Sequence, residues 1–486
     1  MHWLISLLLL VGASNPAAAQ GPAELQPCRL PGLEHQARCG VLQRPLDPQR
    51  PSGPAIDLHY AVLPALARNR QPDPVFFFAG GPGQSALEMA GSVGRLLARV
   101  ANRRDIVLVD QRGTGRSAPL VCEEAQPASP LAEVADLNRT ISRLHACRER
   151  LEKLPHGQLQ HFTTALAMQD ADAVRQALGA ARINLVGGSY GTRAALEYMR
   201  QFPQTVRRVV LDGVAPADMA LPASFSTDNQ AALDAAIGAC TADKACRERL
   251  PELRPRWQAL LASLPRTIQV PHPVTGRVEQ LELTREMLLG MVRSPLYAPA
   301  LAAAVPFALS EAAEGRFQAI VGLSAAVGGG RPLRTAEGMH FSVVCAEDLP
   351  RLSASGDRPG ADFGEMAASL YRQVCAGWPQ GVVTPAFYSL PAAPAATLVL
   401  SGGADPVTPP RHGARVAQAL GGKARHVVVA QAGHGVMGIG CMRDAIYRFL
   451  DAPTDEEALK VDAGCASEIP RPPAFMPPQA PAPPTP

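Results

Sequence analysis

Residues 183–192 read INLVGGSYGT, and this stretch decides the fold. The apolar run Ile183–Val186 predicts a buried strand, and a helical pattern begins at Thr192. Between them stands a G-x-S-x-G motif, which in a strand–turn–helix context holds its serine on a strained bend above the end of a sheet. The two outer glycines fit this geometry because only glycine lets the strand and the helix approach so closely. The stretch therefore predicts Ser189 as a nucleophile; the alternative is a Gly-rich turn with an incidental serine.

Six short apolar runs are predicted to be buried strands, because each is followed closely by Gly or Asp. They are Val75–Phe78, Ile106–Val109, Ile183–Val186, Val209–Leu211, Thr397–Leu400 and His426–Val429. Helical patterns lie between several of them, at Thr164–Leu178, Thr192–Gln201, Arg411–Leu420 and Met442–Leu450. Strands that alternate with helices predict an α/β fold whose mostly parallel sheet is flanked by helices. Ligands bind at the C-terminal ends of such strands, so we expect the functional residues in the loops after these runs.

The alternation stops between about residues 214 and 394. This part is rich in Ala and Leu and carries helical patterns at Asn229–Cys240, Glu286–Arg293 and Ala300–Glu314. It predicts a mainly helical cap, residues 214–394, inserted between strands of a core formed by residues 21–213 and 395–469. The Pro-rich tail, residues 470–486, is expected to be extended or disordered.

A serine hydroxyl needs a base, and the base needs an orienting carboxylate. In this architecture the chain order is serine, acid, histidine. Asp405 follows the fifth predicted strand in G-G-A-D-P, and His434 follows the sixth in G-H-G. Their order and their place at successive strand ends predict a catalytic triad of Ser189, Asp405 and His434. His412, in a predicted helix close to Asp405, is the alternative base.

A glycine-rich loop, G-G-P-G at residues 80–83, follows the first predicted strand. A tetrahedral intermediate needs two N–H donors at its oxyanion. The turn geometry makes the backbone N–H of Tyr190 one donor. We expect the second from this loop, from Gly81 rather than Gly80; the alternative is a simple Gly/Pro turn.

The stretch D-Q-R-G-T-G-R-S at residues 110–117 follows the second predicted strand. It contains G-x-G, but no helix-opening G-x-G-x-x-G follows, so nucleotide binding is not expected. We interpret it as a polar loop that supports the site through a pair between Asp110 and either Arg112 or Arg116, with no catalytic role.

Residues 1–20 predict a secretory signal peptide. The short apolar run Leu4–Val11 is followed by Ala17-Ala18-Ala19, which suits a cleavage site. A membrane anchor is the alternative, but the run is short for a bilayer span. No other stretch approaches about 18 consecutive apolar residues, so the mature chain is expected to be soluble, in the periplasm or the medium.

The ten cysteines all follow this segment, and their even number predicts disulfides in an oxidising compartment. Ten cysteines allow about 945 pairings, so the sequence leaves the connectivity open. Our hypothesis pairs neighbours in sequence: Cys28–Cys39, Cys122–Cys147, Cys240–Cys246, Cys345–Cys375 and Cys441–Cys465. The chain has no C-x-x-C and no Cys/His cluster at zinc spacing, so a metal is not expected.

The composition is that of a globular protein, with 47% hydrophobic and 18% charged residues in a chain of 486. This length suits one large domain with an insertion, or two domains. The formal net charge of +3 provides no basic footprint, so a nucleic-acid partner is not expected. The oligomeric state does not follow from the sequence.

Three motifs together resemble one branch of the α/β hydrolases. G-G-S-Y-G-T at 187–192, G-G-P-G at 80–83 and D-Q-R-G-T-G-R-S at 110–117 look like the branch that holds proline iminopeptidases and tripeptidyl aminopeptidases. The long insertion and S-G-G-A-D-P-V-T-P at 401–409 are similar to its secreted tripeptidyl-aminopeptidase-like members. The resemblance spans roughly residues 28–465 and implies the α/β-hydrolase fold, the triad named above and peptidase activity at a substrate's N-terminus. Ala79 departs from the iminopeptidase pattern, which usually has His before G-G-P-G.

An aminopeptidase must recognise a free ammonium group. This requires carboxylates near the nucleophile that are poorly solvated and otherwise unpaired. Glu347 and Asp348 are our candidates, because they follow the apolar run Phe341–Val344 beside Cys345, and related peptidases place their amine-binding acids in the cap. The alternative is a surface acidic pair.

The sequence therefore predicts an exported serine exopeptidase that acts near the free N-terminus of peptide substrates through an acyl-enzyme, without a metal or organic cofactor. An esterase or lipase-like acyl hydrolase with the same triad is the first alternative. A non-catalytic binding protein on the same scaffold is the second.

Overall fold

The computed structural model describes residues 24–124, 126–326 and 334–478; the predicted signal peptide lies outside them. Within these ranges, nine strands form one sheet in the order β1-β2-β3-β5-β4-β6-β7-β10-β11. Their bounds are β1 Gln26–Cys28, β2 Ala37–Pro45, β3 Ala55–Leu63, β4 Val75–Phe78, β5 Ile106–Val109, β6 Ile183–Gly188, β7 Val206–Asp212, β10 Thr397–Gly402 and β11 Ala424–Val429. From β5 to β11 all neighbours are parallel, whereas β1, β2 and β3 are antiparallel to their neighbours.

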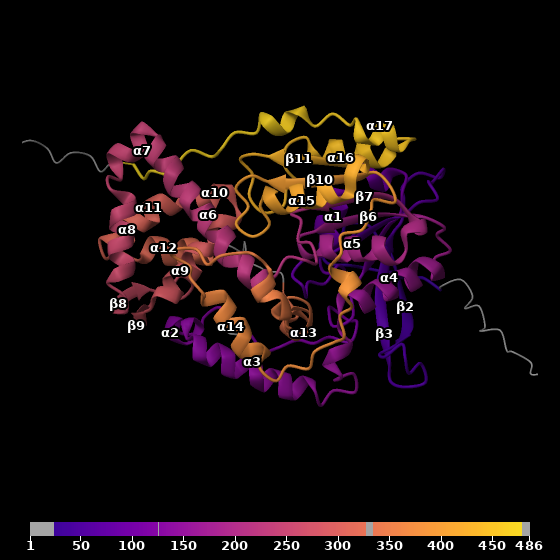
Figure 1. Cartoon of the computed structure of the whole chain (residues 1–486), viewed down its shortest axis with the longest axis horizontal. Coiled ribbons are helices and arrows are strands. Elements are labelled where there is room, and N and C mark those ends of the chain that lie inside the picture. Colours follow the sequence, from indigo (N-terminus) through magenta and orange to yellow (C-terminus); the bar gives the residue numbers. More distant parts are fainter. Residues whose placement is uncertain (1–23, 125, 327–333, 479–486) are drawn as a thin grey trace, which may run out of the picture.

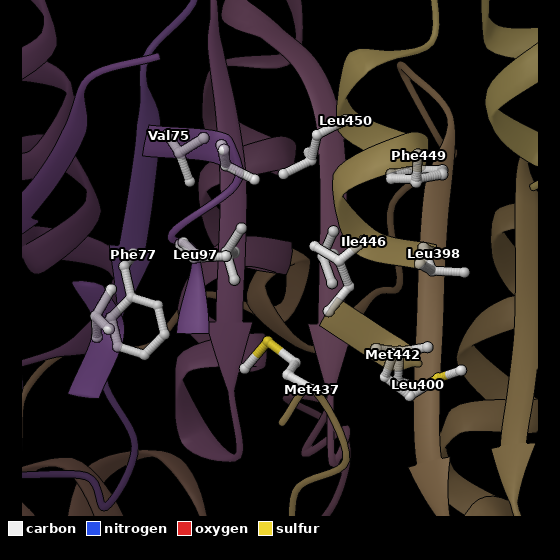
Figure 2. Packing of buried hydrophobic residues seen from close by; sticks show 14 of the residues in the cluster. Val75, Phe77, Leu97, Leu398, Leu400, Met437, Met442, Ile446, Phe449 and Leu450 are labelled. Atoms are coloured by element: carbon white, nitrogen blue, oxygen red, sulfur yellow. The ribbon is translucent and has the colours of Figure 1, made fainter. Parts of the chain in front are cut away.

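Helices cover both faces of this sheet. They are α1 Ala90–Leu96, α4 Thr164–Ala177, α5 Tyr190–Gln201, α15 Pro410–Leu420, α16 Met442–Asp451 and α17 Asp455–Leu459. Phe77 of β4 belongs to the buried cluster that includes α1 and Ile446 of α16 (Figure 2). Phe76, its neighbour, belongs to the opposite cluster with α4, α5 and α15. Burial on both faces explains why the strands read as unbroken apolar runs.

All six predicted strands are strands of this sheet, and the four predicted core helices are confirmed within two residues at each end. The antiparallel strands β1, β2 and β3 were not predicted. Buried, half-buried and exposed side chains are mixed along β2, and β3 begins with exposed positions, so neither reads as a buried run. No helix of the described chain has both the length and the apolar character to cross a membrane.

The segment between β7 and β10 builds a separate hydrophobic core around the fully buried Trp257. Its helices are α6 Leu221–Ala242, α7 Lys244–Arg249, α8 Leu253–Ala262, α9 Arg285–Arg293, α10 Pro299–Ala302, α11 Val305–Ala313, α12 Gln318–Ala325, α13 Glu337–Glu347 and α14 Met366–Cys375, with a hairpin of β8 Arg266–Pro271 and β9 Val278–Leu283. This segment, called the insertion below, lies beside the sheet, on the left in Figure 1. The predicted helix at 300–314 is two helices, because α10 ends at Ala302 and α11 begins at Val305.

Two helices from outside residues 214–394 pack with the insertion. They are α2 Leu131–Ala135 and α3 Leu137–Leu151, which come between β5 and β6 in the chain. Arg143 of α3 donates to Glu337 of α13, with Nη1 and Oε2 2.6 Å apart, and α3 runs alongside α14 (Figure 1). The structure beside the sheet is therefore built from two segments of the chain, where the sequence predicted one.

Five disulfides occur in the described chain, and each joins the neighbours in sequence that we expected. The described residues contain no free cysteine. The pair Cys122–Cys147 ties α3 to the loop that follows β5, and Cys345–Cys375 joins α13 to α14. Both pairs therefore fix helices that lie outside the sheet.

Residues 470–478 are the described part of the Pro-rich tail, which we expected to be extended or disordered. They form no helix or strand, but they pack on the insertion, to which Figure 1 shows the yellow chain crossing from the core. The backbone N of Phe475 donates to the carbonyl oxygen of Ala303 at 2.9 Å. The ring centroids of Phe475 and Phe307 are 5.9 Å apart. Aromatic packing holds this proline-rich stretch, which composition alone could not reveal.

Phe449 provides a test of the core. It is fully buried in α16 against the sheet (Figure 2), so Phe449→Ala should lower the free energy of unfolding by about 3–5 kcal/mol. The matched control is Val382→Ala, because Val382 is 91% exposed, and its effect should stay within about 0.5 kcal/mol. Urea unfolding with the disulfides intact measures both values, and equal effects would contradict this packing.

Candidate active site

Ser189 stands at the junction of β6 and α5 in a strained conformation, with φ 56° and ψ −125°. A Cβ on Gly191 would lie 2.1 Å from the carbonyl oxygen of Phe78, and one on Gly187 would lie 2.3 Å from that of Gly191. Both positions therefore admit only glycine, as the motif predicted. The strained serine is held by a hydrogen bond from its backbone N to the carbonyl oxygen of Asp212, 2.8 Å away.

The structure brings Asp405 and His434 together at the ends of β10 and β11. Nδ1 of His434 lies 2.8 Å from Oδ2 of Asp405, whose side chain is buried. The Thr408 hydroxyl donates to the same Oδ2 at 2.8 Å, and the backbone N–H groups of Val407 and Thr408 donate to Oδ1 at 2.9 Å. Asp405 engages Nδ1, which leaves Nε2 as the basic nitrogen.

Charge and hydrogen bonding set the pKa values of this pair. Burial opposes the charged form of Asp405, but His434 and the N–H donors hold the pKa of Asp405 below its ordinary value. Burial alone would lower the pKa of His434, but the Asp405 carboxylate outweighs burial and raises it. A histidine stabilised as imidazolium in this way suits the role of a general base.

The glycine-rich loop lies directly against Ser189. A Cβ on Gly80 would be 3.2 Å from Cβ of Ser189, and Gly81 adopts φ 111°, which favours glycine. Within the described part of the chain, the backbone N–H groups of Gly81 and Tyr190 have no hydrogen-bond partner. Free N–H groups beside a strained serine are what an oxyanion requires.

Asp212 is a buried residue of the site that the sequence reasoning missed. Its carboxylate accepts N–H bonds from Val436 and Met437, at 2.8 to 2.9 Å, in the loop that carries His434. Burial raises the pKa of Asp212 to about 6, although the two N–H donors oppose this. The signal was present in the sequence, because Asp212 directly follows the predicted strand Val209–Leu211 and precedes a glycine.

The polar loop at 110–117 supports the site, but not through the pairs we expected. Asp110 accepts from the hydroxyl of Ser85 at 2.6 Å and from the backbone N of Arg116 at 3.2 Å. Arg112 pairs instead with Asp170 of α4, at 2.7 and 3.0 Å. Both oxygens of Asp170 accept from Arg112, one from Nε and one from Nη2, which is the paired geometry that a planar guanidinium favours.

Asp348, which we expected to be an unpaired carboxylate, is paired in the structure. Its side chain is fully buried, and both of its oxygens accept from Arg193 of α5, at 2.8 and 2.9 Å. Asp348 therefore does not meet the requirement of an otherwise unpaired carboxylate.

Glu347 is also occupied. It accepts from the backbone N of Thr164 at 2.7 Å and from its hydroxyl at 2.8 Å, and that hydroxyl contacts the phenol of Tyr190 at 2.6 Å. Burial raises the pKa of Glu347 to about 7, although Arg193 opposes the shift. Both acids therefore connect α13 to the core, and neither meets the requirement of an unpaired carboxylate.

His412, the alternative base, faces away from this arrangement. Its Nε2 lies 2.9 Å from Oδ2 of Asp228 in α6, and its side chain is buried. The geometry favours His434, which contacts Asp405.

Two family models match the chain. The model described as "alpha/beta hydrolase fold" covers residues 73–237, which include Ser189. The model described as "TAP-like protein" covers residues 361–462, which include Asp405 and His434.

Three relatives represent the similar proteins. Serine protease Hip1 of Mycobacterium tuberculosis (strain ATCC 25618 / H37Rv) is 33% identical over 43% of this chain and 43% of its own length. Tripeptidyl aminopeptidase of Streptomyces lividans is 33% identical over 37% of this chain and 36% of its own. Carboxylesterase B of Mycobacterium tuberculosis (strain CDC 1551 / Oshkosh) is 27% identical over 79% of this chain and 78% of its own length. The matched stretch thus spans less than half of the first two relatives.

Asp212→Asn tests the positioning of the His434 loop. The amide keeps the size of the side chain, but it offers one acceptor oxygen in place of two, so the loop should shift. We expect kcat on a short-chain aryl ester to fall about tenfold to a hundredfold with KM little changed, since small misplacements of a catalytic group are costly. Asp444→Asn is the control, because Asp444 is half exposed and pairs with Arg99. An unchanged kcat, in a variant whose thermal unfolding is normal, would remove this role.

The pH profile tests the Asp405–His434 pair. A general base acts when neutral, so kcat/KM on a neutral ester should rise with pH through an apparent pKa above about 6.5, the value of a free histidine. In Asp405→Asn the pKa should fall, because the raising charge is gone, and kcat should drop about 10⁴-fold. The same apparent pKa in both proteins would show that His434 does not govern the profile.

Proposed function

The chain belongs to the α/β hydrolases and its C-terminal part to their TAP-like group, and from this premise we propose a serine exopeptidase that cleaves peptide bonds near a free N-terminus. The observation that carries the proposal is the Asp405–His434 hydrogen bond, which lies at the same edge of the sheet as the strained Ser189 turn. The names of the mycobacterial protease and the Streptomyces aminopeptidase support peptides as substrates.

The proposed reaction proceeds through an acyl-enzyme. Oγ of Ser189 adds to the substrate carbonyl carbon while Nε2 of His434 takes its proton, and the N–H groups of Gly81 and Tyr190 stabilise the oxyanion. The C–N bond then breaks, and the leaving amine takes the proton from His434. Water, activated by the same nitrogen, hydrolyses the ester and restores the Ser189 hydroxyl. Asp405 keeps Nδ1 protonated and stabilises the imidazolium throughout.

We also propose that the chain is exported. Disulfides persist in oxidising compartments, and five occur in the described residues. The predicted signal peptide at residues 1–20 supports the same destination.

An esterase is the second candidate. The relative that matches the largest share of this chain among the three described above is named a carboxylesterase, and the same triad cleaves esters. The two candidates differ in the substrate that the insertion admits.

Three matched substrates separate these functions: a free-amine tripeptide amide, its N-acetylated twin and a short-chain aryl ester. The exopeptidase should cleave the free-amine peptide and leave the acetylated one intact, and Ser189→Ala should lose at least about 10³-fold of this activity. Labelling by a fluorophosphonate verifies that the nucleophile is competent. Turnover of the ester with both peptides intact would refute the peptidase proposal in favour of the esterase.

A further inference from the structure

Arg293 is the last residue of α9, and it lies next to the candidate triad. Its Nη2 donates to the phenol oxygen of Tyr297 at 3.0 Å. Tyr297 in turn contacts His434 in two ways. The two rings pack edge to face with their centroids 5.4 Å apart, and the carbonyl oxygen of Tyr297 accepts from the backbone N of His434 at 3.0 Å. One tyrosine therefore separates the guanidinium from the catalytic histidine.

This guanidinium has no acidic partner. No carboxylate of the described residues lies within 4.0 Å of it, and the residues outside the described ranges include no Asp or Glu. Its Nε is buried without a hydrogen-bond partner, and Nη1 makes no hydrogen bond to the described residues. Buried N–H donors without acceptors cost free energy, and a ligand that accepts from them would remove this cost.

Three other arginines, which are buried, each pair with a carboxylate. Arg104 pairs with Asp73 and Asp451, and Arg112 pairs with Asp170. Arg193 pairs with Asp348. The fold supplies a carboxylate at each of these positions, whereas it leaves Arg293 beside the candidate active site without one.

Aromatic rings surround Arg293. The guanidinium carbon lies 4.8 Å from the ring centre of Phe225 and 5.8 Å from that of Tyr297. These faces and the C-terminal end of α9 stabilise a cation, but they accept no in-plane N–H bonds. They orient the guanidinium and leave its fork available.

The side chains around this guanidinium are not sealed from solvent. Ser189, His434, Arg293 and Tyr297 are all partly exposed. The positive charge of Arg293 opposes protonation of His434, so it acts at the site electrostatically. A carboxylate from a substrate would neutralise it and pair with its free nitrogens.

We propose that Arg293 binds a carboxylate of the substrate and thereby selects acidic substrates. This proposal rests on the proposed function, and it names the substrate class of the same site. The carboxylate comes either from an acidic side chain next to the cleaved bond or from the C-terminus of a short peptide.

Binding measured by calorimetry separates this proposal from catalysis. The host is Ser189→Ala, with and without Arg293→Gln or Arg293→Lys. One pair of free-amine tripeptides ends in a carboxylate or an amide, and a second pair of amides carries Glu or Gln at its third residue. In the host, the carboxylate member of at least one pair should bind about tenfold to a hundredfold more tightly. Arg293→Gln should abolish this preference, and Arg293→Lys should keep part of it.

Arg266→Gln is the control. Arg266 also faces an aromatic ring, that of Phe317, but it belongs to β8 of the hairpin.

The pair that shows the preference identifies the source of the carboxylate. Equal binding within both pairs overturns the proposal, and so does a preference that survives in Arg293→Gln. An aryl ester pair, a hemisuccinate and its carboxamide twin, gives the same ratio from kcat/KM in proteins with Ser189. If both peptides resist hydrolysis, the exopeptidase fails, whereas the calorimetric and ester ratios still decide the role of Arg293.

Discussion

Asp212 joins the two loops on which the candidate triad depends. Its carbonyl oxygen accepts a hydrogen bond from the backbone N of Ser189. Its carboxylate accepts from the backbone N–H groups of Val436 and Met437, just after His434. β7 lies between β6 and β10 in the sheet, so one residue on a buried strand fixes the nucleophile and the base relative to each other. The carboxylate is costly to bury, as its raised pKa shows. Its two N–H bonds restrict the loop that carries His434, where Gly433 and Gly435 allow the backbone many conformations.

Two polar contacts connect α13 of the insertion to the core. Asp348 at the end of α13 pairs with Arg193, four residues after Ser189, and His340 of the same helix contacts the carbonyl oxygen of Pro82 at 3.2 Å. Helix α13 therefore contacts both the helix that starts at the nucleophile and the loop that faces it. Removing one partner of the buried Arg193–Asp348 pair would leave an uncompensated charge at a cost of about 3–5 kcal/mol.

The sequence predicted what local sterics and strand order dictate. The G-x-S-x-G turn follows from close backbone approach, and the six buried strands follow from unbroken apolar runs. The positions of Asp405 and His434 follow from the ends of two of those strands. It could not predict the partners of Asp348 or Arg112, because pairing across 155 and 58 residues depends on tertiary contacts that no local pattern encodes. The packing of Phe475 on the insertion was missed for the same reason.

These pairings leave a cation, Arg293, without an acidic partner beside the candidate triad, whereas the two acids expected to bind the substrate are paired. The two acids expected to bind an ammonium group accept instead from Arg193 and Thr164, and burial raises the pKa of Glu347 to about 7. Arg293, by contrast, keeps its charge and its free donors next to Tyr297. In the proposed exopeptidase, the strongest electrostatic contact to the substrate then falls on an acidic group that it carries. The site then distinguishes substrates by the carboxylate they carry as well as by the amine they present.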